Sequence, residues 1–139
     1  MCPKRVYLSF APEDSPKINK LLPLLRSPDY DLDFYDGPLD LDFDALGAEA
    51  IKHAIGEKIV KCDIAVCLIS ENTHKSKWVD CQLQKNRNKG NKIIAMALKG
   101  TVDAVLPIVI KEENLKFYPL DPQRLRTLII AETPKIFNR

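Results

Sequence analysis

The segment Asp63-Ile-Ala-Val-Cys-Leu-Ile-Ser70, with the loop Glu71-Asn-Thr-His-Lys75 and the stretch Ser76-Lys-Trp-Val-Asp-Cys-Gln82 that follow it, decides the fold. Its first part is almost wholly apolar, as is typical of a strand in a sheet that helices cover on both faces. The polar loop comes next, and a helix begins near Ser76. Gly90 stands where a left-handed helix C-cap belongs. We therefore predict a central strand, a loop and a helix.

The helix places two candidate ligand-binding side chains together. Trp78 and Gln82 are four residues apart, so they share one face of the helix, one turn from each other. The loop before them leaves the carboxyl end of the central strand, which is where open α/β sheets bind their ligands. We expect an aromatic ring and an amide to face the mouth of the sheet.

The segments before this unit alternate between strand and helix patterns. Residues 5–10 predict a first strand, and Pro16 suits the first turn of the next helix, with Ser15 or Asp14 as its cap. Pro23 should kink or shorten that helix. Residues 30–35 predict a second strand, a candidate for an edge position.

The connection that follows holds Leu39-Asp-Leu-Asp-Phe-Asp44, which alternates like a strand but which we interpret as a loop. Asp44 is a candidate cap for a helix that carries Ile51, Ile55 and Ile59 on one face.

Beyond Gly90, residues 92–98 predict a fourth strand and residues 106–110 a fifth, with residues 116–122 as a loop before a final helix. Strands that alternate with helices predict a parallel sheet with right-handed crossovers. We expect one α/β domain over residues 1–139, with the flavodoxin-like strand order 2-1-3-4-5 and helices on both faces.

The composition excludes several classes of protein. Hydrophobic residues make up 45% and charged residues 29% of the chain, which is ordinary for a globular protein. The net charge of +2 is too small to indicate nucleic-acid or membrane binding, and no apolar run approaches the roughly 20 residues that span a bilayer. The four cysteines form no Cys-x-x-Cys pair, no signal-peptide core precedes the first strand, and the two histidines have no metal-site spacing. We expect a cytoplasmic protein with reduced thiols and without a metal.

Two known users of this strand order do not fit the residues. A flavodoxin needs a phosphate loop after the first strand, and Ala11-Pro-Glu-Asp-Ser15 has no glycine for close approach. A response-regulator receiver needs an aspartate at the end of the third strand, which here ends Leu68-Ile69-Ser70.

A third group matches an ordered set of short segments. These segments are Val6-Tyr-Leu-Ser9-Phe10 with Glu13-Asp14, Phe34-Tyr-Asp36, the strand that ends Ile69-Ser70, Asn72-Thr73, and Ser76-Lys-Trp78-Val79. Together with the strand after Gly90 they resemble the TIR-like domains of the ThsB type, from the bacterial Thoeris anti-phage systems. The resemblance covers about Lys4 to Leu98, and the ordered set is more specific than any one motif.

The resemblance implies an enzyme of the NAD nucleosidase or ADP-ribosyl cyclase type. Proteins like this cleave nicotinamide from NAD and make an ADP-ribose-derived signal that activates a partner effector. NAD is then the substrate, and no cofactor is implied. Self-association or a phage protein as trigger are further partners that the resemblance suggests.

One position departs from the family pattern. The family has a catalytic glutamate in its Trp-Val-x-x-Glu segment, and here Gln82 takes that position. Two interpretations stay open, a natural pseudo-enzyme or an inactivating substitution in an active parent. The rest of the motif is intact, which favours the second.

Five further residues are candidates for substrate binding, each with a simpler alternative. Ser9 and Phe10 end the first strand beside the third, Asp36 could bond a ribose or only form a turn before Gly37, and Asn72 could hold a ligand or order its loop. Trp78 could line the pocket or anchor its helix in the core.

Two alternative functions remain at this point. The missing charge at Gln82 is compatible with a non-catalytic module that binds a nucleotide or docks on other TIR surfaces. A nucleoside deoxyribosyltransferase-like hydrolase is a third candidate, and it too would need a carboxylate near the sheet mouth.

Overall fold

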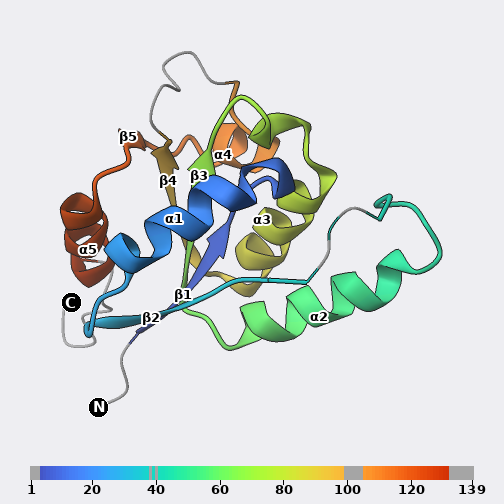
Figure 1. Cartoon of the computed structure of the whole chain (residues 1–139), viewed down its shortest axis with the longest axis horizontal. Helices are drawn as coiled ribbons and strands as arrows, with labels where there is room; N and C mark the ends of the chain where they lie inside the picture. The colour runs from blue at the N-terminus through green and yellow to red at the C-terminus, as the bar shows by residue number, and fades with distance from the viewer. Residues whose placement is uncertain (1–3, 38, 40, 99–104, 132–139) are drawn as a thin grey trace.

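A five-stranded parallel sheet forms the centre of the protein. The computed structural model describes residues 4–37, 39, 41–98 and 105–131. The strands stand in the order β2-β1-β3-β4-β5 (Figure 1), as predicted. Their bounds are Lys4–Ser9 for β1, Tyr30–Asp33 for β2, Ile64–Ile69 for β3, Lys92–Ala97 for β4 and Phe117–Pro119 for β5.

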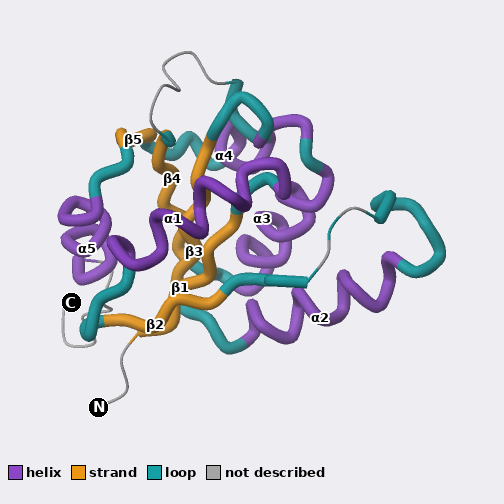
Figure 2. Tube along the Cα trace, in the orientation of Figure 1, coloured by secondary structure: helices purple, strands orange, loops and turns teal. Residues whose placement is uncertain are grey.

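Helices surround the sheet, which runs through the middle of the molecule (Figure 2). The α-helices are α1 (Ser15–Leu25), α2 (Ala48–Val60), α3 (Lys77–Lys89), α4 (Ile108–Glu112) and α5 (Pro122–Ala131). Two short 3-10 helices, η1 (Pro12–Asp14) and η2 (Thr73–Lys75), follow β1 and β3.

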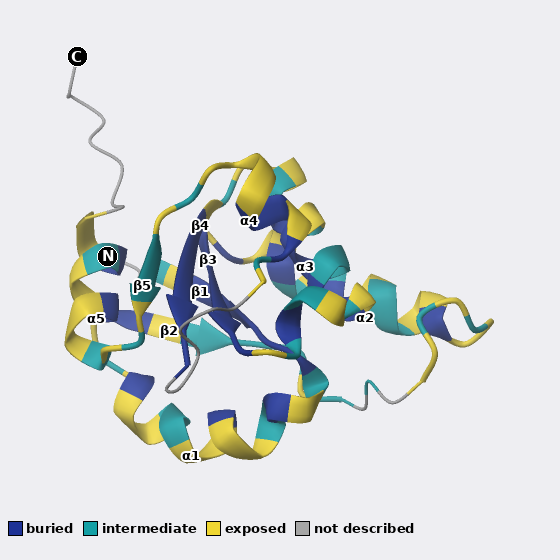
Figure 3. Cartoon of the chain, turned by 90° about the horizontal axis from the view of Figure 1, so that it is seen from above, coloured by how far each residue is buried: buried dark blue, intermediate teal, exposed yellow. Residues whose placement is uncertain are grey.

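The two faces of the sheet carry separate apolar clusters. Leu8, Val66 and Met96 pack on one face with side chains of α1 and α5, while Ala65 and Cys67 pack on the other face with side chains of α3 and α4. All six residues of β3 are buried, and in Figure 3 the inner strands β1, β3 and β4 are largely dark blue, whereas the edge strands β2 and β5 are largely intermediate. A central strand that is covered on both faces has no polar positions, which explains the apolar run in the sequence.

Helix α3 begins and ends where the sequence predicts. The Ser76 side-chain oxygen accepts a hydrogen bond from the Val79 N–H at 3.2 Å and so caps the helix. Gly90 follows the last turn with φ of +92°, the left-handed conformation that glycine adopts without a steric cost.

The prediction for the fifth strand is wrong. Residues 106–110, predicted as that strand, instead lead into α4, where Val109 and Ile110 are buried and Ile108 is 55% exposed. A short apolar run does not distinguish a strand from one turn of helix. The fifth strand is Phe117–Pro119, within the residues predicted as a loop. The sheet tolerates its proline because β5 lies at the edge.

The predicted cap of α2 also needs correction. Asp44 does not cap α2, which begins after Gly47 without a side-chain cap, and it pairs instead with Lys77 at 3.1 Å. In α1, Pro23 lies inside the helix, which ends two residues later at Leu25.

Two expectations from the sequence concern the state of the cysteines and the length of the helices. Cys62 and Cys67 are buried, Cys81 is half-buried, and all three are free thiols, whereas Cys2 lies outside the described residues. None of the helices in the described ranges is long and apolar enough to cross a bilayer.

Substitutions of two glycines by alanine should change the free energy of unfolding in opposite directions. Replacing Gly90 by alanine should lower the free energy of unfolding by roughly 1–2 kcal/mol, because an L side chain is strained at that φ. Replacing Gly56, inside α2, by alanine should raise the free energy of unfolding by about 0.5–1 kcal/mol, since a Cβ there meets only the flexible Lys85 side chain at 3.7 Å. Urea unfolding of both variants measures the difference, and equal effects would contradict these helix assignments.

Candidate functional site

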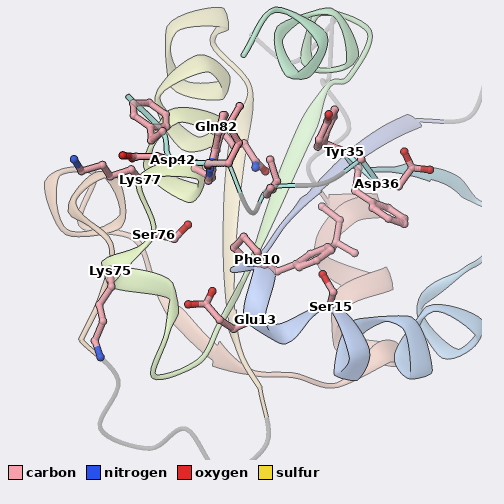
Figure 4. Close-up of a pocket in the computed structure, with 18 of the residues that line it drawn as sticks. Phe10, Glu13, Ser15, Tyr35, Asp36, Asp42, Lys75, Ser76, Lys77 and Gln82 are labelled. Atoms are coloured by element: carbon pink, nitrogen blue, oxygen red, sulfur yellow. The ribbon is translucent and has the colours of Figure 1, made fainter. Parts of the chain in front are cut away.

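A pocket of about 1020 Å³ opens at the carboxyl edge of the sheet, beside the first residues of α3. Three segments enclose it, namely the turn after β1, the long connection between β2 and α2, and the start of α3. Figure 4 shows Lys75, Ser76 and Lys77 on one side of the hollow and Tyr35 and Asp36 on the other.

Gln82 is the most informative side chain of this pocket. Its residue is 3% exposed, yet it lines the hollow. Its backbone carbonyl accepts a hydrogen bond from the Asn86 amide at 2.9 Å, but its own side-chain amide bonds to none of the described residues. Neither amide atom is among the fully buried side-chain atoms that lack a partner, so the amide reaches the open space of the pocket, where water or a polar ligand can bond to it.

Trp78 lines the same pocket one turn earlier and is 5% exposed. Its indole N–H donates to the Leu41 carbonyl at 3.2 Å, and its ring stands edge-on to Phe43 with 5.0 Å between the ring centroids. The ring is therefore both a wall of the pocket and an anchor for the residues around Phe43, so the two interpretations of Trp78 are compatible.

Residues 39 and 41–47, here called the roof segment, cover one side of the pocket. Besides the Trp78 contacts, Lys77 bonds to Asp44 at 3.1 Å, and the Lys52 ammonium lies 3.9 Å from the centroid of the Phe43 ring. The Lys77–Asp44 pair is exposed, so it contributes little to stability, and the aromatic contact is the stronger attachment.

The structure brings four of the six predicted site residues together. Phe10, Asp36, Trp78 and Gln82 all line the pocket, although they come from three different segments of the chain.

Ser9 and Asn72 do not line it. Ser9 is fully buried with an unpartnered hydroxyl, and the side-chain amide of Asn72 donates to the Asp14 carboxylate at 3.3 Å.

Several lining residues were not anticipated from the sequence. They are Glu13, Ser15, Asn19, Tyr35 and the roof residues Leu39, Leu41, Asp42 and Phe43. The alternation of Leu39, Leu41 and Phe43 was a usable signal, because apolar side chains that recur in a loop must pack on something.

Asp80 does not supply the missing charge beside Gln82. It is absent from the pocket lining, and one of its carboxylate oxygens is buried without a partner. Burial raises the pKa of the Asp80 carboxyl. Burial, with a smaller effect of Asp80, also raises the pKa of the Cys67 thiol to about 12. Neither Asp80 nor Cys67 lines the pocket.

A sequence profile of the family described as Thoeris protein ThsB, TIR-like domain, matches residues 7–103, more than half of the chain. The chain belongs to this family. The matched range of the ThsB-type domain contains both ends of the pocket lining, from Leu8 to Gln82.

Two solved structures are similar to this ThsB-type domain, and the first of them shares its fold. The CMP N-glycosidase BcmB of Clostridium botulinum is 18% identical, with a TM-score of 0.56 over 91% of this chain and 99% of that one. The TIR domains of the activated Roq1 resistosome, which recognises the pathogen effector XopQ, are 20% identical, with a TM-score of 0.47 over 93% of this chain and 72% of that one. No curated protein matched the sequence.

The burial of Asp80 predicts a dependence of stability on pH. A carboxyl whose pKa is raised by folding contributes stability at low pH, and that contribution is lost as the pH rises through the raised pKa. Asp80→Asn should therefore raise the melting temperature at pH 7 and change it little at pH 3. Asp31→Asn, at an exposed position of β2, is the control. A gain at pH 3 equal to that at pH 7 would contradict the assignment.

Proposed function

We propose that this ThsB-type domain cleaves the nicotinamide–ribose bond of NAD and yields an ADP-ribose-derived signalling nucleotide in anti-phage defence. The observation that carries the proposal is Gln82, which lines the pocket at the position where the resemblance places the family's catalytic glutamate. With glutamine there, we expect this chain to cleave NAD slowly.

The chemistry of the bond explains why a carboxylate belongs at this position. When the C1′–N bond breaks, nicotinamide leaves with the electron pair, and the ribose becomes an oxocarbenium-like cation that water or another nucleophile captures. A carboxylate beside the ribose stabilises that charge and can accept a hydrogen bond from a ribose hydroxyl. Gln82 keeps the hydrogen bond but not the charge.

Glutamine in place of glutamate should lower the rate of NAD cleavage strongly and change nucleotide binding little. A hydrogen bond to a charged group contributes about 1.5–3 kcal/mol, against about 1 kcal/mol for a neutral one. With the lost stabilisation of the cation added, cleavage should be slower by a factor on the order of 10²–10³, while nucleotide binding is retained.

The pocket suits a nucleotide in size and lining. Its volume of about 1020 Å³ lies at the upper end of the range for small-molecule sites. We assign Phe10 and Trp78 to contacts with the flat rings and Asp36 to a ribose hydroxyl. The product would diffuse to a downstream effector, and we propose that the reaction takes place in the cytoplasm.

The neutral Gln82 favours one further candidate function, a non-catalytic module that binds a nucleotide. Calorimetry with NAD and with ADP-ribose tests binding without turnover, and light scattering tests self-association. CMP should be included as a third ligand, because the structurally similar BcmB is a CMP N-glycosidase.

Restoring the charge tests the proposed activity directly. Gln82→Glu should release nicotinamide from NAD about 10²–10³ times faster than the unchanged chain, measured by chromatography of the reaction mixture.

Gln84→Glu provides the matched control, because it adds the same charge to the same helix at an exposed position outside the pocket. It should leave the rate unchanged. An inert Gln82→Glu variant, or equal gains in both variants, would overturn the proposal.

A further inference from the structure

A buried carboxylate lies just behind the pocket, and the proposed chemistry does not use it. Asp14 is 1% exposed and does not line the pocket. One of its oxygens accepts a hydrogen bond from the Ser70 hydroxyl at 2.5 Å, and the other accepts one from the Asn72 side-chain amide at 3.3 Å. The first contact has the short distance of a charge-assisted hydrogen bond.

The partners of Asp14 are themselves joined. The Ser70 N–H donates to the Thr73 hydroxyl at 2.7 Å, and the Asn72 N–H donates to the Ser70 hydroxyl oxygen at 3.0 Å. Asp14, Ser70, Asn72 and Thr73 thus form one largely buried cluster, here called the Asp14 clamp. Within the described part of the chain no cationic side chain pairs with Asp14, so these hydrogen bonds and the amino end of α1, where Asp14 is the N-cap, compensate its charge.

The clamp joins two adjacent loops that lead to residues lining the pocket. Asp14 ends η1, whose residues Pro12 and Glu13 line one wall. Ser70 follows the last residue of β3, and Thr73 begins η2, which leads directly to the cap of α3 at Ser76. The hydrogen bonds cross 56 and 58 residues of sequence. They therefore fix where α3 begins relative to β1.

Gln82 and Trp78 depend on that starting point. Both lie within the first two turns of α3, and a helix transmits a shift of its first residue to its neighbours as a rigid body. Misplacement of a reacting group by about 1 Å can cost about 10²-fold in rate. A clamp at the N-terminal end of α3 thus controls how residue 82 faces the ribose.

We propose that Asp14 is a positioning residue of the nucleotide site, which acts through Ser70 and Asn72 on the start of α3. In this proposal Asn72 belongs to the support of the site rather than to the ligand. The part that concerns turnover rests on the proposed NAD cleavage, whereas the part that concerns pocket geometry does not.

Asp14→Asn and Ser70→Ala test the clamp from its two sides in the full chain. The first keeps the size of the side chain but removes its charge, and the second removes the hydroxyl that Asp14 accepts from. Trp78 is the one tryptophan of the sequence and lines the pocket, so its fluorescence reports pocket geometry without any substrate. We expect a red shift of emission and stronger acrylamide quenching in both variants.

Ile129→Val and Ile129→Ala control for a general loss of stability. Ile129 is buried in α5, outside the pocket lining, and the variant whose melting temperature is closest to that of Asp14→Asn is the matched one. It should leave Trp78 fluorescence unchanged. Equal fluorescence changes in the clamp variant and its matched control, or none in Asp14→Asn and Ser70→Ala, would overturn the proposal.

The same substitutions in the Gln82→Glu chain test turnover. Asp14→Asn should lower kcat for NAD about 10- to 100-fold with a smaller change in KM, because a displaced helix harms the transition state more than ground-state binding. An unchanged kcat, or a loss equal to that of the Ile129 control, would overturn the role in turnover. If Gln82→Glu itself is inert, the proposed function fails, and the fluorescence result still decides the clamp.

Discussion

Parallel pairing between β1 and β3 is the constraint on which the pocket depends. Their register, from Val6 opposite Ile64 to Ser9 opposite Cys67, brings the carboxyl ends of two strands to one edge although they are far apart in the sequence. The chain leaves β1 toward α1 on one face and β3 toward α3 on the other. Two connections that diverge to opposite faces leave a crevice between them, as at the switch points of other open α/β sheets. The pocket is thus a consequence of strand order before any polar side chain is considered.

The central unit could be predicted from the sequence because its signals are local and agree with one another. Each of these signals involves residues that are close in the sequence, namely the apolar run of β3, the Ser76 cap and Gly90 after α3. The fifth strand could not, because Phe117–Pro119 is three residues long and pairs with β4 through contacts that no local pattern records. The same limit applies to the site. Phe10 and Asp36 were found from their places at predicted strand ends, and Trp78 and Gln82 from their shared helix face and the family motif. The roof segment reaches the pocket through tertiary contacts with Trp78 and Lys77, which no local pattern records.

Asn72 and Ser9 show why polar residues at a strand end are ambiguous. Polar side chains at the carboxyl edge of a parallel sheet can bind a ligand, or they can form the hydrogen bonds that order the loops there. The same residue types serve both purposes. Asn72 serves the second purpose through Asp14. Ser9 is buried outside the pocket whereas Phe10 lines it. Successive residues of an extended chain point to opposite faces, so these two neighbours face different surroundings.

Gln82 combines a packed position in the fold with a polar group that faces the pocket. The residue is 3% exposed, but its amide is not among the buried side-chain atoms that lack a partner, so it reaches the open space of the pocket. Leucine or methionine would fill the same volume if packing alone decided this position. The amide instead offers a hydrogen-bond donor and an acceptor to water or to a ligand. The proposed nucleotide binding would use these two groups, whether or not the missing charge still permits fast cleavage.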